Sequence, residues 1–478
     1  MRKVLLAITI GWLFTVPAFA QEKWDLRRCV DYAVANNISV QQSKVQERLS
    51  ELIYLQSKDS RWPTANLQGN GGEQFGRSVD PTTNQFTTQA ISFLNMGLQS
   101  GVTLFNFFSI KNTIEANKLT VAANKAQTDK VRGDISLNVS AGYLQALLSF
   151  EQAKIAEVQV AQTKEQLFAT RKRVDAGSLP ELNAAELEAQ LSTDTATLIT
   201  AQSQYQLNLL SLKALLNLDA AAPFDIVTPP AELIPVMPLT DLDPAIVFSE
   251  AVKTQPLQLA NELRVKAAQK NTAVARGQMY PTLGAFGNLN SSYSSAQKTI
   301  NVGTPEISYL PSSLYVPFNG TNFPVYTPSQ KYPGVQDANV FRQFDRNFRQ
   351  SFGVSLNVPI FNGHQARTQW QRAKLNEVNL GLQSLADSQT LKQDVYQAYQ
   401  NATSALQTFN SRTKAVETAE KSYNLGKKRY DIGLLPTLDL ITLQSNLQRA
   451  KLNVVSSQYD YIFRLKVLEF YKYNSIKL

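Results

Sequence analysis

Few residues of the 478-residue chain have the side chains that usually carry catalysis or bind metals. It contains a single histidine, His364, and a single cysteine, Cys29. One histidine excludes a multi-histidine metal site, and one cysteine excludes an internal disulfide and a cysteine-based zinc cluster. No nucleophile–base set or phosphate-binding loop is visible, so we predict no catalytic, cofactor-binding or metal-binding residue and no cofactor. We expect Cys29 to be buried in an early helix and His364 to have an exposed or capping role.

The most informative motif occurs twice. Residues 173–182 read RVDAGSLPEL, and residues 429–438 read RYDIGLLPTL. A glycine just past a helix end accepts the left-handed conformation, and a proline suits the first turn of the next helix. Each motif therefore predicts a turn between two antiparallel helices, at residues 177–180 and 433–436. Leu179 and Leu434 at these exposed tips indicate a docking surface for another helical hairpin.

The two motifs belong to an internal duplication. Residues 62–64 (WPT) align with residues 280–282 (YPT) at an offset of 218, and residues 102–106 align with residues 358–362 at an offset of 256. The second offset then holds without a gap to the last residue. The difference of 38 residues predicts an insertion in the second copy, at residues 294–346, which we expect to be a long irregular loop because it is rich in proline. These prolines are Pro305, Pro311, Pro317, Pro324, Pro328 and Pro333.

The duplication predicts four segments. Residues 1–20 are expected to be a signal peptide, with a positive start, an apolar core and an Ala-Phe-Ala cleavage site. The first repeat is residues 21–222, a proline-rich linker is residues 223–244, and the second repeat is residues 245–478. No later stretch reaches the ~20 apolar residues of a membrane-spanning helix. We therefore expect an exported protein without a helical membrane span.

Each repeat contains a pair of segments with alternating polar and apolar residues, which predict β-hairpins at about 64–104 and 282–361. Their clearest strands are Ser92–Leu104 and Phe352–Ile360. These lengths approach the ~9–11 residues that cross an outer membrane, and no second sheet is predicted, which counts against a soluble sandwich. Four strands cannot close a barrel, so identical copies must combine their strands; two copies give 8 strands, three give 12 and four give 16. The arithmetic does not choose among these numbers.

Long helices follow each strand pair. We expect helices at about Ile38–Arg61, Phe107–Ala176 and Glu181–Leu216, and a matching set in the second repeat. A heptad seam runs along each long helix, and a small residue follows three positions after most of its members, with Arg412 as the exception in the second repeat. In the first repeat it comprises Val139, Ala146, Ala153, Val160, Leu167 and Val174 with Gly142, Ser149, Ala156, Thr163 and Thr170; in the second, Val395, Ala402, Phe409, Val416, Tyr423 and Tyr430 with Ala398, Ala405, Ala419 and Gly426.

The duplicated chain, the two strand pairs, the two tip motifs and the signal peptide together resemble the TolC family of outer-membrane efflux proteins over essentially the whole mature chain. The resemblance implies an α+β membrane protein that forms a homotrimer. In this arrangement twelve strands make one outer-membrane β-barrel, and the helices continue it as a periplasmic α-helical barrel. The family's tips dock on a periplasmic adaptor protein, which is bound to an inner-membrane transporter of the resistance-nodulation-division or ABC type.

The resemblance also implies roles for individual residues. The expected adaptor-docking residues at the tips are Gly177, Leu179, Pro180, Gly433, Leu434 and Pro436. Tyr430 matches a tyrosine that helps hold the family's pore shut, and Asp439 matches an aspartate that lines the closed constriction. This chain departs from the family at three gate positions, where it has Leu435 for an arginine, Thr442 for a second aspartate, and Asn183 as the first-repeat equivalent of Asp439.

The resulting prediction is a passive outer-membrane channel of an efflux or type I export system in a Gram-negative bacterium. The alternative is a coiled-coil spacer or adhesin without a conducting pore; an enzyme is a third, weaker reading. The net charge of +9, two units of it in the expected signal peptide, is spread over the chain and does not indicate a nucleic-acid partner. The exported substrate cannot be read from the sequence, because selectivity in this family resides in the pump.

Overall fold

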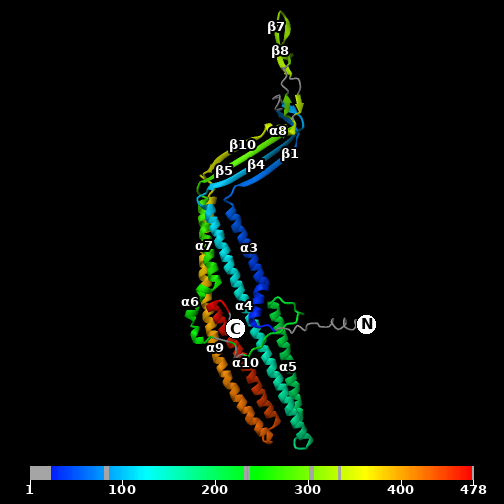
Figure 1. The fold of residues 1–478 in the computed structure, drawn as a ribbon, viewed down its shortest axis with the longest axis vertical. Coiled ribbons are helices and arrows are strands. Elements are labelled where there is room, and N and C mark those ends of the chain that lie inside the picture. The colour runs from blue at the N-terminus through cyan, green and yellow to red at the C-terminus, as the bar shows by residue number, and fades with distance from the viewer. Residues whose placement is uncertain are drawn as a thin grey trace, which may run out of the picture. The chain divides into compact units, whose positions relative to one another are not determined.

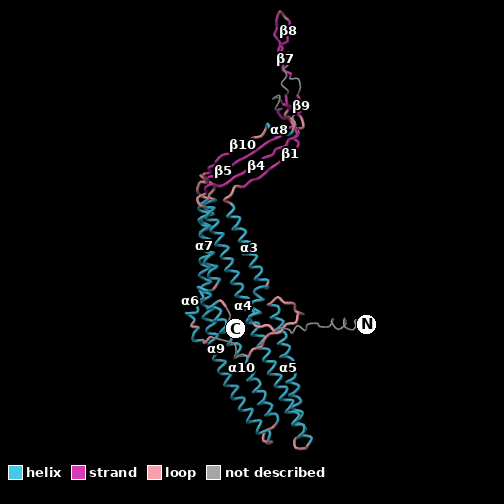
Figure 2. The backbone as a smooth tube through the Cα atoms, in the orientation of Figure 1, coloured by secondary structure: helices cyan, strands magenta, loops and turns pink. Residues whose placement is uncertain are grey.

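The computed structural model describes residues 23–79, 86–230, 234, 237–300, 306–331, 335–337 and 339–475. The expected signal peptide lies outside the described residues. The chain divides into two compact units. Unit 1 comprises residues 1–54, 116–269 and 374–478, and unit 2 comprises residues 55–115 and 270–373. All named strands lie in unit 2, as the magenta segments of Figure 2 show.

Helices account for most of the described chain (Figure 1). They are α2 (Leu26–Asn36), α3 (Ile38–Asp59), α4 (Ser109–Asp175), α5 (Glu181–Leu215), α6 (Pro244–Thr254), α7 (Pro256–Gly277), α8 (Val340–Arg346), α9 (Gln365–Asp431) and α10 (Thr437–Tyr473). The long helices α4 and α9 have 67 residues each and contain no proline. Helix α4 starts two residues after the predicted Phe107, because Phe107 and Phe108 have positive φ angles that an α-helix excludes.

Two helical hairpins, α4–α5 and α9–α10, form much of unit 1 (Figure 1). The small positions of the predicted seam are its most consistently buried part. In α4, Ser149, Ala156, Thr163 and Thr170 are buried, and Gly142 is half-buried. In α9 the buried seam residues include Val395, Ala402, Tyr423 and Tyr430. Small side chains let helix backbones approach closely but remove little apolar area from water, so further packing is needed for stability.

That packing comes from two apolar clusters beside the linker. One joins α2, α4, α5 and α10 and includes Cys29, Leu147, Leu212 and Ile226. Cys29 is fully buried in α2, as predicted, and its burial raises the pKa of the thiol to about 12. The second cluster joins α6, α9 and α10 around Leu242, Val395 and Leu465. The linker is therefore packed into the helical unit through Ile226 and Leu242.

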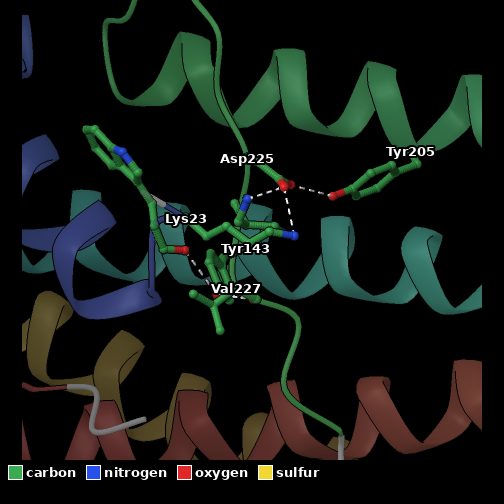
Figure 3. Close-up of polar contacts among 7 residues, drawn as sticks. Lys23, Tyr143, Tyr205, Asp225 and Val227 are labelled. Carbon is green, nitrogen blue, oxygen red and sulfur yellow. Dashed lines mark hydrogen bonds and ion pairs between the residues drawn. The ribbon is translucent and has the colours of Figure 1, made fainter. Parts of the chain in front are cut away.

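Polar contacts hold the start of the described chain against the linker (Figure 3). Trp24 and Ile226 form an isolated parallel β-bridge. Lys23 Nζ lies 2.9 Å from a carboxylate oxygen of Asp225, and the hydroxyl of Tyr205 donates to the same carboxylate at 3.4 Å. The Tyr143 hydroxyl donates to the Val227 carbonyl at 2.5 Å, and burial raises the pKa of this tyrosine.

Unit 2 contains a four-stranded antiparallel sheet. Its strands are β1 (Thr64–Gln74), β4 (Ile91–Phe105), β5 (Thr282–Ser294) and β10 (Arg349–Asn357), in the order β1-β4-β5-β10 (Figure 1). Each repeat contributes two neighbouring strands, and the central pair β4–β5 joins the repeats. Strands β1 and β10 are the two edges of this sheet.

The register of the sheet places the alternating residues of all four strands on common faces, because directly paired residues point to the same side. One row pairs Leu67 with Leu98 and Leu98 with Leu289, and another row of the same face pairs Val102 with Ala285 and Ala285 with Val354. We call this side the apolar face. The other side, which we call the polar face, is mostly amides and hydroxyls: Thr64, Asn66, Gln68, Asn70, Gln99, Asn95, Asn288, Asn290, Ser292, Ser351 and Ser355.

The fourth strand ends earlier than the alternation predicts. β10 runs from Arg349 to Asn357, whereas the predicted strand extended to Ile360. Pro359 has no backbone N–H for the ladder and restricts Val358 before it, so the pattern continues beyond the pairing. Ile360 is 94% exposed.

The prediction of an irregular loop at 294–346 is wrong for most of its described residues. They form β6 (Lys298–Ile300) paired with β9 (Val335–Asp337), the hairpin of β7 (Glu306–Phe318) and β8 (Thr321–Lys331), and helix α8. Asn319 and Gly320 form the β7–β8 turn with positive φ angles, a standard two-residue hairpin turn. Prolines occur within β7 and β8 because each strand of an isolated pair has one side without ladder hydrogen bonds.

The remaining strands, β2 (Arg77–Val79) and β3 (Phe86–Thr88), form a separate short pair. Among the described residues, no helix is both long enough and apolar enough to cross a membrane.

Tyr205 is expected to make unit 1 sensitive to alkali. Burial, followed by the Asp225 carboxylate, raises its pKa from 10.0 to about 12. The unfolded chain loses this proton first, so the stabilising contribution is complete below pH 10 and is lost between pH 10 and 12. The chain loses free energy of unfolding as the pH rises from 10 to 12. Because Tyr205 is only half-buried, we expect Tyr205→Phe to make this loss smaller by about 1 kcal/mol. Urea unfolding followed by tryptophan fluorescence at pH 8 to 12 measures it.

The matched control is Tyr396→Phe, since Tyr396 is 44% exposed. Identical alkaline slopes for Tyr205→Phe and the unmodified chain would contradict this assignment.

Candidate functional site

Both predicted tips are helix hairpin turns of the same kind. The Ser178 N–H donates to the Arg173 carbonyl and the Gly177 N–H to the Val174 carbonyl, which is the Schellman arrangement at the end of α4. Leu434 and Gly433 repeat these bonds at the end of α9. Gly177 and Gly433 have φ angles of +70° and +79°, a conformation that favours glycine.

Prolines and apolar residues complete the tips. Pro180 and Pro436 are the N-cap residues of α5 and α10. Leu434 is 65% exposed, while Leu179 is half-buried. Each repeat also exposes a leucine in the first turn of its return helix, Leu182 and Leu438. The tips thus present apolar side chains to solvent at equivalent positions of the two repeats.

Above the tips, hydrogen bonds join the two hairpins of the chain through helices α4 and α9. The Tyr430 hydroxyl lies 3.0 Å from the Thr170 hydroxyl, and the Gln166 amide donates to the Tyr423 hydroxyl at 2.8 Å. Tyr430, Tyr423 and Thr170 are buried. Of the two predicted gate residues, Tyr430 lies in this network. Asp439 lies outside this network. It is exposed in the first turn of α10, where the helix dipole stabilises a negative charge.

A third connection is centred on Asp194 of α5, a carboxylate that is only 7% exposed. It accepts hydrogen bonds from Thr163 at 2.6 Å, from Gln190 at 2.7 Å and from Gln159 at 3.3 Å. The Gln444 amide of α10 donates to the Thr163 hydroxyl oxygen at 3.0 Å. Because the carboxylate can only accept, it orients the Thr163 hydroxyl and leaves its oxygen free to accept from Gln444.

Sequence reasoning identified part of this network. Thr163, Thr170, Tyr423 and Tyr430 are seam positions, and each pair is seven residues apart on one helix. Asp194 and Gln444 were missed, because single polar residues in a helix rich in Gln, Ser and Thr resemble its exposed surface.

The side chains that usually carry catalysis or bind metals lie outside this network. His364 is exposed, as predicted, and directly precedes α9, where its backbone carbonyl accepts from the Thr368 N–H. In the described part of the chain, no group of three or more His, Cys, Asp or Glu side chains is arranged to hold a metal ion.

Replacing Thr163 by Val is expected to destabilise the chain. The change keeps the shape of the side chain but removes the hydrogen bonds that join Thr163 to Asp194 and to Gln444 in a buried site, which costs about 1–3 kcal/mol of unfolding free energy. Thr163→Ser should retain most of the stability. Urea unfolding followed by circular dichroism measures the difference.

Thr195→Val is the matched control, because Thr195 is exposed and its hydroxyl bonds only the Leu191 carbonyl of its own helix. Equal losses for Thr163→Val and Thr195→Val would show that the Asp194 network adds nothing to the contact.

Comparison with known proteins gives consistent results over most of the chain. The profile of a family described as "Outer membrane efflux protein" matches residues 30–218 and 247–469. The outer membrane efflux protein BepC of Brucella suis is 21% identical over 434 residues, which cover 90% of this chain and 81% of BepC. The outer membrane protein TolC of Escherichia coli is 21% identical over 337 residues, 70% of this chain and 60% of TolC.

A solved structure has the same fold. The CusC structure, which was solved to show conformational changes accompanying folding and transmembrane channel formation, has a TM-score of 0.72 and 15% identity. The alignment covers 95% of this chain and 92% of the CusC chain.

Proposed function

The chain belongs to the outer membrane efflux protein family, and we propose that three copies of it form a passive export channel that works with a periplasmic adaptor and an inner-membrane pump. Its location is the outer membrane and its role is efflux, as in BepC and TolC. The observation that carries the channel proposal is the four-stranded sheet, which has one apolar face, one polar face and two unpaired edges.

The edges require partners. In lipid, each backbone N–H or C=O without a hydrogen bond costs several kcal/mol, so an open sheet cannot remain there. Strand β1 of one copy and β10 of the next are antiparallel edges that can pair and continue the sheet. Three copies of four strands then give the twelve-stranded barrel that the family resemblance implies.

The faces fit lipid on one side and water on the other. Large side chains of the apolar face are exposed in the single chain, including Leu67 at 71%, Phe352 at 75% and Val354 at 70%. Lipid tails would cover them around a closed barrel, and the amides and hydroxyls of the polar face would line a water-filled lumen. A coiled-coil spacer or adhesin would not need this division, so the sheet favours a channel.

The tips supply the proposed docking surface. The two turns have the same geometry, which is set by Gly177 and Pro180 in the first and by Gly433 and Pro436 in the second. Leu434 is exposed in the second turn. An adaptor hairpin with apolar tip residues would bury these side chains. This channel would move its cargo without making or breaking covalent bonds, and energy would come from the pump.

The contact between hairpins is the proposed gate. Tyr430 holds α9 to α4 through Thr170, so separating the hairpins breaks this bond. In the trimer, we place the exposed Asp439 at the constriction. Leu435 is half-buried against the Tyr423 and Tyr430 cluster, so this chain packs an apolar side chain where the family has an arginine.

Edge-strand cross-linking tests the assembly. In a Cys29→Ser background, Gln68→Cys on β1 is combined in turn with Ser351→Cys or Ser355→Cys on β10. Neighbouring strands lie ~4.8 Å apart, so a short thiol cross-linker cannot join the two edges within one chain. We expect linked dimers and trimers and nothing larger, and ion conductance in planar bilayers.

The control pair is Gln99→Cys with Asn288→Cys, which face each other within one chain and should give no ladder. Monomers alone from every edge pair, together with absent conductance, would refute the channel.

Tyr430→Phe tests the gate. Loss of a buried hydrogen bond worth about 1 kcal/mol should raise the ratio of open to closed tips roughly five-fold per copy. Single-channel recording and sensitivity of cells to a large antibiotic measure the opening. The double variant with Thr170→Val should open no further than Tyr430→Phe, because both changes remove the same bond. Additive effects, or unchanged conductance, would count against this role.

A further inference from the structure

The four strands of the sheet carry only two charged residues, and these lie on opposite faces. Glu73 of β1 pairs with Ser92 in the rows of the apolar face, and Arg349 of β10 pairs with Asn290 in the rows of the polar face. All residues of these strands are described. The polar face therefore has a single charge, which is positive.

Arg349 borders an open cleft of about 400 Å³ on this face. The cleft is lined mainly by side-chain amides and hydroxyls and by no carboxylate; its amides come from Gln68, Asn70, Asn95, Gln99, Asn290 and Asn347. Within the described part of the chain, no carboxylate pairs with the Arg349 guanidinium, and its side chain is exposed.

The row of Arg349 also explains the hollow. It runs Gln68, Gly97, Asn290, Arg349, and Gly97 leaves its position without a side chain. The Asn290 amide leans over Gly97, since an added Cβ there would lie 2.5 Å from its oxygen. Amide N–H groups and a free guanidinium are donors for negatively charged oxygens, and the cleft has no acidic group that would repel them.

We infer that Arg349 sets the ionic preference of the polar face, so that this part of the duct favours solutes carrying carboxylate or phosphate groups. The inference deepens the proposed function, because it assigns a specificity-determining residue to the lumen of that channel. Three copies would place three guanidinium groups around one lumen, in a wall that is otherwise uncharged.

A reporter cysteine measures this preference without relying on conduction. Ser292→Cys lies on the polar face, diagonal to Arg349 on the neighbouring strand, ~7–8 Å away. Purified protein in detergent is reacted with an anionic and a cationic methanethiosulfonate of similar size, and mass spectrometry gives the two rates. The native Cys29 is fully buried with a raised thiol pKa, so the chain without the reporter should remain unlabelled.

We expect the anionic-to-cationic rate ratio to fall about five-fold on Arg349→Gln at low salt, the effect of one unit charge at this distance in water. Arg349→Glu should lower it further, and Arg349→Lys should preserve it. The differences should nearly vanish at 1 M salt, where the screening length is ~3 Å. If Arg349 had only a structural role, the rate ratio would depend neither on the sign of the charge at position 349 nor on the salt concentration.

Glu73→Gln is the matched control, because it removes the only strand charge of the opposite face and should leave the ratio unchanged. Equal ratios for Arg, Gln and Glu at position 349, or an equal change on Glu73→Gln, would overturn the inference. Failure of the channel would appear instead in the edge-strand cross-linking, so the two outcomes are distinguishable.

Discussion

The hydrogen-bonding groups at the edges of a four-stranded sheet are the constraint on which the rest of this molecule depends. Strands β1 and β10 each have one paired side, and their exposed apolar side chains are suited to lipid, where unpaired backbone groups are most costly. A single chain in water hydrates its edge groups but exposes its apolar side chains. In lipid it would cover the apolar side chains but leave the edge groups unpaired. In the proposed trimer, copies that share their edges would satisfy both conditions.

The helical unit meets a different condition. Its hairpins are joined near the tips by polar side chains between small residues, whereas the linker region has dense apolar clusters. A buried hydrogen bond adds only about 1 kcal/mol to stability, yet leaving its groups unpaired costs more. Contacts of this kind hold one arrangement in register and still separate when a partner supplies replacement bonds or water. The apolar clusters suit a part of the molecule that keeps its structure.

Much of this architecture follows from local patterns. Alternating polar and apolar residues predict the strands. Long stretches without proline predict α4 and α9, because a proline inside a helix removes a backbone hydrogen-bond donor. Pairing decides the rest: β10 ends at Asn357 although its alternation continues, and β7–β8 forms despite its prolines. The Asn319-Gly320 turn was the available signal for that hairpin. The Asp194 network is not predictable from one helix, since its partners come from three.

The duplication preserves shape more than chemistry, and the polar contact between the two hairpins shows the difference. At the offset of 256, Thr163 and Thr170 correspond to Ala419 and Gly426, and Tyr423 and Tyr430 correspond to Leu167 and Val174. Asp194 corresponds to Ala450, which has no polar side chain. The first repeat thus supplies the small hydroxyls, the carboxylate and the Gln166 amide, and the second supplies the phenols and the Gln444 amide. In the proposed trimer, the second hairpin of one copy would meet the first hairpin of the next through these equivalent positions. Because the residues at most of them cannot hydrogen-bond through their side chains, that contact would not repeat the polar contact within one chain.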